Sequence, residues 1–96
     1  SASARAINLP PVADAGEDVT LSADEEGKAT ALLDGTRSYD PDGSIVKWAW
    51  EDGGGRVIGD APQVRVRLSA GVHVFHLTVT DDRAASSRST ITVQIR

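Results

Sequence analysis

Short runs in which apolar and polar residues alternate make up most of this chain. Such period-two alternation is typical of strands with one buried face. Turn-forming pairs such as Asp-Gly and Gly-Gly separate the runs, and no window shows a helical period. The expected strands are a broken one at 12–15 and 19–23, and then 29–33, 44–50, 64–68, 73–80 and 90–95. The pattern therefore predicts an all-β sandwich.

Aromatic residues and histidines lie on two of the expected strands. Alternation along 44–50 puts Val46, Trp48 and Trp50 on one face. We expect Trp50 to be the core tryptophan and Trp48 to stay half-exposed, where it is a candidate contact for a sugar or a protein partner. His73 and His76 fall on opposite faces of their strand, so we do not expect them to ligate one ion together.

Composition and charge narrow the class of function. The 96 residues predict one domain over 8–96, preceded by a linker or expression remnant at 1–7. A net charge of -4 argues against binding nucleic acid or an anionic membrane surface. There is no cysteine, and no apolar run of the roughly 20 residues that span a bilayer. With no Gly-x-Ser-x-Gly motif either, we do not expect an enzyme.

The most informative motif is acidic. Asp40-Pro41-Asp42-Gly43 precedes one expected strand, and Asp81-Asp82 closes another. In an immunoglobulin-like sandwich these two loops lie side by side, at the pole where the N-terminal segment enters. That topology would gather Asp40, Asp42, Asp81 and Asn8, whose oxygens suit calcium.

Simpler interpretations stay open for these acidic residues. Asp before Pro or Gly also forms turns by itself, and Asp82 is expected to face solvent. A helix-loop-helix calcium loop beginning at Ser38 is not expected, because Ala49 stands where that loop needs a bidentate Glu.

Several segments, taken in order, resemble the polycystic kidney disease (PKD) domain family of bacterial secreted proteins. They are Asn8 to Gly16, Leu33 to Gly43, Trp48-Ala49-Trp50 and Gly71 to Asp82. The resemblance implies an immunoglobulin-like β-sandwich of about seven to eight strands and an extracellular, non-catalytic module. Some members bind calcium, and their ligands carry over onto Asn8, Asp40, Asp42 and Asp81. The segment after Trp50 departs from the family, which often has an aromatic residue and Gly-Asp-Gly there.

These observations predict a spacer or interaction module of a larger extracellular or cell-surface protein, stabilised by calcium at its N-terminal pole. The expected partners are neighbouring domains of the parent chain, and also polysaccharide or extracellular protein, with the chain itself monomeric. The alternative is a module that tethers a parent enzyme to polysaccharide or protein substrate through Trp48. Homophilic adhesion through strand edges is a third possibility.

Overall fold

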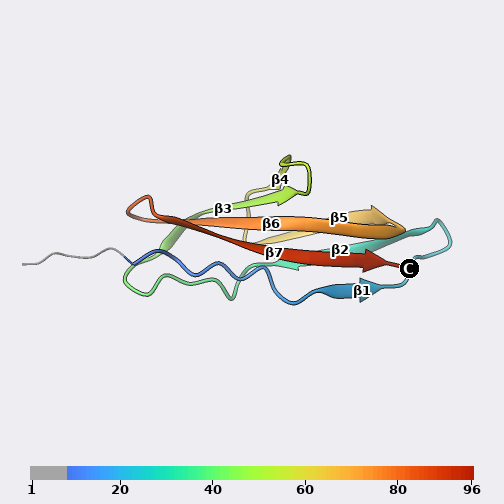
Figure 1. The fold of residues 1–96 in the computed structure, drawn as a ribbon, viewed down its shortest axis with the longest axis horizontal. Coiled ribbons are helices and arrows are strands. Elements are labelled where there is room, and N and C mark those ends of the chain that lie inside the picture. Colours follow the sequence, from blue (N-terminus) through green and yellow to red (C-terminus); the bar gives the residue numbers. More distant parts are fainter. Residues whose placement is uncertain (1–8) are drawn as a thin grey trace, which may run out of the picture.

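Residues 9–96 are described by a computed structural model, in which every regular element is a strand (Figure 1). The seven strands are β1 (Val19–Leu21), β2 (Lys28–Asp34), β3 (Ile45–Asp52), β4 (Val57–Gly59), β5 (Gln63–Ser69), β6 (Gly71–Asp81) and β7 (Ser86–Ile95). This described part contains no helix that could cross a membrane. The all-β expectation is confirmed.

The strands form two sheets of unequal size. The larger has the order β1-β7-β6-β3-β4, and the smaller consists of β2 and β5. Neighbours run antiparallel except β1 and β7, which are parallel. The chain ends beside β1, where the Arg96 amide donates to the Leu21 carbonyl at 2.9 Å. The start of the described chain and the C-terminus lie at opposite ends of an elongated molecule (Figure 1).

The core lies between the sheets and draws on alternate positions of the long strands. It consists of Ala15, Ala31, Leu33, Trp50, Phe75, Leu77, Val79, Ile91, Val93 and Ile95. Trp50 has no exposed surface, and its Nε1–H donates to the Ala61 carbonyl at 3.1 Å. The ring is therefore buried without leaving its polar group unsatisfied, as expected for the core tryptophan.

One expected burial is wrong. Val46 does not share the inner face with Trp48 and Trp50, and 63% of it is exposed. The pairing of β3 with β6 shifts register between Ile45 and Lys47, which leaves Val46 as the extra residue of a bulge. Ile45 packs against the core instead, because the bulge reverses the alternation at this point.

The strand boundaries differ most from the expected ones at three places. Residues 12–15 form no strand, only an isolated bridge between Val12 and Tyr39. The short β4 follows a glycine-rich turn where no separate strand had been expected. Strand β7 begins at Ser86 rather than near Thr90, because its first half pairs with β6 through serine and threonine positions that carry no apolar signal.

Candidate metal centre

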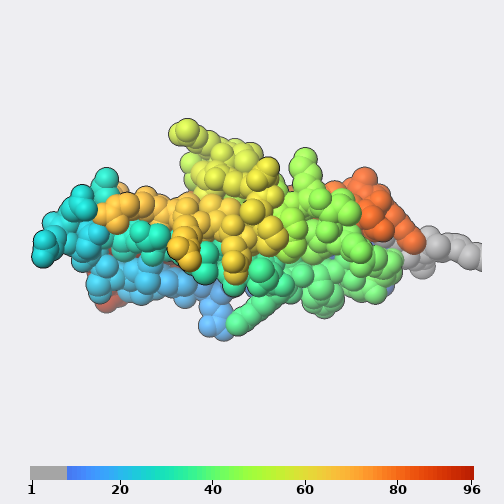
Figure 2. Space-filling view, turned by 180° about the vertical axis from the view of Figure 1, so that it is seen from behind, coloured from blue at the N-terminus to red at the C-terminus, as the bar shows by residue number. Residues whose placement is uncertain are grey.

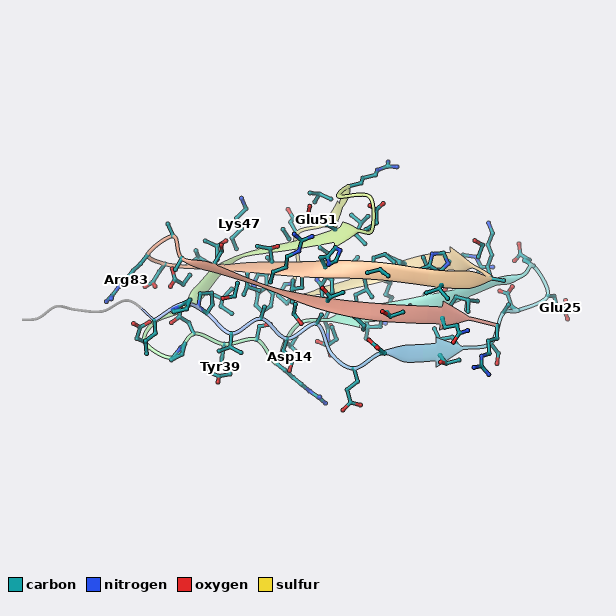
Figure 3. The ribbon with its side chains drawn as sticks, in the orientation of Figure 1. Asp14, Glu25, Tyr39, Lys47, Glu51 and Arg83 are labelled. Atoms are coloured by element: carbon teal, nitrogen blue, oxygen red, sulfur yellow. The ribbon has the colours of Figure 1, made fainter. Side chains whose placement is uncertain are left out.

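Two acidic loops meet at the end of the sandwich where the chain enters, called here the N-terminal pole. Asp40 and Asp42 lie between β2 and β3, while Asp81 ends β6 and Asp82 begins the following turn. The β3–β6 pairing holds the loops together, since Ile45 is opposite Asp81 and the Asp82 amide donates to the Ser44 carbonyl at 3.0 Å. Figure 3 shows Arg83 at this pole and Glu25 at the opposite one. The expected neighbourhood of the two loops is thus present.

Backbone amides orient the carboxylates. Asp40 Oδ1 accepts from the Asp42 amide at 3.0 Å, and Asp42 Oδ2 accepts from the Leu9 amide at 2.8 Å. Asp81 is 1% exposed, and its Oδ1 accepts from the amides of Arg83 and Ala85 at 2.9 and 2.8 Å. These bonds stabilise the two loops and tie the start of the described chain to the first of them.

The side chains that come closest are Asp40, Asp81 and Asp82. One carboxylate oxygen from each lies within 4.8 Å of the others. Asp82 is exposed, as expected, but it also joins this group, which strand alternation did not predict. Alternation stops applying where β6 ends, so a turn can bring two consecutive acids to one side. Gly43 leaves the necessary room, because a Cβ there would lie 2.6 Å from Asp82 Oδ1.

Of the other two predicted ligands, Asp42 lies beside this group and Asn8 is not described. Asp42 borders the group without belonging to its closest set, since one of its oxygens is bonded to the Leu9 amide. Asn8 lies outside the described residues, so its expected role stays a prediction.

The pKa values of Asp40 and Asp42 are shifted in opposite directions. Desolvation raises the pKa of Asp40 above its ordinary value, and the neighbouring Asp42 and Asp81 carboxyl groups raise it further. The pKa of Asp42 is lowered, mainly because the Leu9 amide donates to its carboxylate. Of these two aspartates, Asp40 is therefore the one whose negative charge is less well compensated by the protein.

The donor set is one that a hard divalent cation prefers. Asp40 Oδ2 is buried and has no hydrogen-bond partner among residues 9–96. A buried carboxylate oxygen without a donor is costly, and a cation would compensate it. Carboxylates and backbone carbonyls suit calcium, which accepts six to eight oxygens in loose geometry. The residues present therefore fit calcium.

The aromatic and histidine side chains that the sequence analysis considered make contacts within the fold. Trp48 is partly buried and packs against the core, so only part of its ring is available to a partner. The more exposed aromatic is Tyr39, which is 56% exposed and points away from the sandwich (Figure 3). His73 and His76 have separate partners, the Ser69 carbonyl and the Thr90 hydroxyl, in line with their expected opposite faces.

Comparisons with known proteins agree with one another. A family model described as "K319L-like, PKD domain" matches residues 15–95. The human dyslexia-associated protein KIAA0319 is 38% identical over 96 residues, a match that covers 91% of this chain and 8% of that protein. The chain thus spans less than a tenth of the length of this curated relative.

Two solved structures show the same architecture. The PKD domain from KIAA 1837 protein has a TM-score of 0.72 and 28% identity, over 97% of this chain and 92% of that one. A structure of carbohydrate-binding modules from the β-sandwich superfamily has a TM-score of 0.73 and 26% identity, over 94% of this chain and 36% of that one.

Proposed function

The chain belongs to the PKD-domain family, and from this premise we propose that it is an extracellular spacer and interaction module, stabilised by calcium at its N-terminal pole. The family is one of non-catalytic modules, and relatives of this chain are domains within larger proteins. The expected bacterial subtype is not borne out, since the matching family model is K319L-like and the relative named above is human.

The observations that carry the calcium proposal are the grouping of Asp40, Asp81 and Asp82 and the buried Oδ2 of Asp40, which has no hydrogen-bond partner among residues 9–96. Two unit charges about 4 Å apart repel by roughly 1 kcal/mol in water and by about 4 kcal/mol at an effective dielectric of 20. Without a cation, this repulsion destabilises the folded domain. Bound calcium would supply positive charge and replace the repulsion with attraction.

The proposed role of the ion is mechanical. Asp40, Asp81 and Asp82 would hold it, with Asp42 and Asn8 as further candidate ligands. Because the Leu9 amide bonds to Asp42 and the Asp42 amide bonds to Asp40, stiffening of this loop extends to the chain that enters the domain. The junction to a preceding domain would then be more rigid with calcium than without it.

A thermal-unfolding measurement tests the calcium site. We expect the melting temperature to rise when excess chelator is replaced by millimolar calcium, because only the folded chain gathers the carboxylates. The double change Asp40→Asn and Asp42→Asn should remove this increase while the domain still folds.

The matched control is Asp60→Asn, an exposed aspartate between β4 and β5 that should leave the calcium response unchanged. An unchanged melting temperature in the wild type, together with no heat of binding in calorimetry, would contradict the proposal.

The likeness to carbohydrate-binding modules supports a second candidate function, a module that binds polysaccharide or a protein substrate for its parent protein. Trp48 and Tyr39 are the aromatic side chains at which a sugar ring would stack. Trp48 reaches solvent only in part, so this candidate rests mainly on the shared architecture.

A further inference from the structure

Strand β5 has one edge that pairs with no other described strand. Its other edge pairs with β2 throughout. The Gly35 amide donates to the Pro62 carbonyl at 2.8 Å, and the Ala70 amide donates to the Gly27 carbonyl at 3.1 Å. In an antiparallel pair, the main-chain groups of successive residues point alternately toward and away from the partner strand. The main-chain groups of Pro62 and Ala70 point toward β2, so those of the even-numbered residues of β5 between them do so as well. The main-chain amides and carbonyls of Arg65 and Arg67 therefore face the open edge.

A groove of about 550 Å³ runs beside this edge. Its apolar lining comes from both sheets and includes Ile58, Val66, Leu68, Val72 and Phe75. The opposite wall is the turn after β3, which stands above β5 in Figure 2. Strand β4 is only three residues long and pairs with β3, not with β5. The groove thus places apolar side chains, with the polar Asp52, Arg67 and His73 among them, beside the open main-chain groups.

The edge also has a defined charge pattern. Arg65 and Arg67 are both exposed, and the groove is lined by Val66 between them and also by Arg67. Arg67 already forms ion pairs with Asp24 at 2.8 Å and Glu26 at 3.2 Å, which shows that carboxylates are accommodated on this face. Arg65 forms no ion pair with any residue in 9–96.

The same charges oppose pairing between two copies of β5. An antiparallel pair centred on Val66 would place Arg65 of one copy opposite Arg67 of the other. Like charges directly opposite one another destabilise a pair of strands. These charges therefore disfavour self-association through this edge and favour pairing with a negatively charged strand.

We propose that the open edge of β5 binds an extended peptide in which acidic and apolar residues alternate. The peptide adds as an antiparallel strand. Its main chain bonds to Arg65 and Arg67, its acidic side chains lie beside the two guanidinium groups, and an apolar side chain opposite Val66 enters the groove. Main-chain bonds provide affinity in this mode, and the alternate side chains provide specificity. The site shares no residue with the calcium pole and does not depend on it.

An NMR titration of the full chain tests this site with the peptide acetyl-Ser-Val-Glu-Val-Glu-Val-Ser-amide. We expect saturable shifts centred on the Arg65 and Arg67 amides, together with slower hydrogen exchange at both. Replacing both Glu by Lys in the peptide, or Arg65→Glu in the protein, should weaken binding by about tenfold or more, since charge-assisted contacts are lost. Arg88→Glu on β7 is the matched control and should bind as the wild type does.

A second probe separates strand addition from charge attraction alone. The same peptide methylated at both Glu nitrogens keeps its charge but loses two main-chain donors, so we expect about tenfold weaker binding. Equal binding by the methylated peptide, shifts centred away from β5, or no binding at millimolar peptide would overturn the proposal. Titrations with chelator and with calcium should agree, so failure here is distinguishable from failure of the calcium site.

Discussion

At the scale of single residues, small side chains set how closely functional groups and core groups approach. Gly35 follows an aspartate and reads as an ordinary turn residue in the sequence. In the fold it is buried, and a Cβ there would lie 2.6 Å from Leu77 Cδ2 and 3.2 Å from both Trp48 and Trp50. Two tryptophans on one strand are thus accommodated because the facing residue has no side chain.

Substitution of this glycine should destabilise the domain. We expect Gly35→Ala to lower the free energy of unfolding by about 1–3 kcal/mol, the usual cost of overpacking a core. Urea denaturation followed by tryptophan fluorescence measures the change. Gly54→Ala is the control: its nearest neighbour would be Asp52 Oδ1 at 3.4 Å, so the effect should stay within about 0.5 kcal/mol. Equal effects of the two changes would refute this account of the packing.

At the scale of elements, the bulge at the start of β3 decides which side chains reach the core. It brings Ile45 inward and leaves Val46 in solvent, two residues before the partly buried Trp48. The same segment pairs with the end of β6, next to Asp81. The bulge therefore sits where the acidic loops leave the sheet, and it reorients the chain as it enters β3.

A pair of matched substitutions tests this register. Ile45→Thr should reduce the free energy of unfolding by about 1–3 kcal/mol, because it places a hydroxyl in partly buried apolar surroundings. Val46→Thr should change it by no more than about 0.5 kcal/mol, since that side chain is exposed. Chemical denaturation of both variants measures the difference. The reverse order would mean that Val46, as regular alternation predicts, faces the core.

At the scale of the whole molecule, the described chain enters at one pole and leaves at the other (Figure 1). This arrangement suits a module strung between neighbours, with the acidic loops at the entry junction and the β5 groove along the side. The proposed peptide site on the flank and the proposed calcium site at the pole are spatially separate. Both can therefore operate in one molecule.

The carbohydrate-binding candidate is tested at this scale by retention of the chain on insoluble polysaccharides. If the candidate is right, we expect the wild type to be retained, and Trp48→Leu or Tyr39→Leu to weaken retention because leucine lacks the ring face that stacks on a sugar. Leucine is chosen for Trp48 because it keeps apolar packing, and melting curves should verify that both variants fold. Passage of the wild type through every polysaccharide would contradict this candidate and favour the spacer function.

The sequence by itself determined the strand class and the core tryptophan, because alternation and turn residues are local signals. It predicted the meeting of the two acidic loops only through an assumed immunoglobulin-like strand order. Only the tertiary structure decided that Val46 is exposed and that Asp82 joins Asp40 and Asp81. It also decided which edge of β5 stays open. Bulges, inter-sheet packing and strand order depend on contacts between distant segments, so no local pattern contains them.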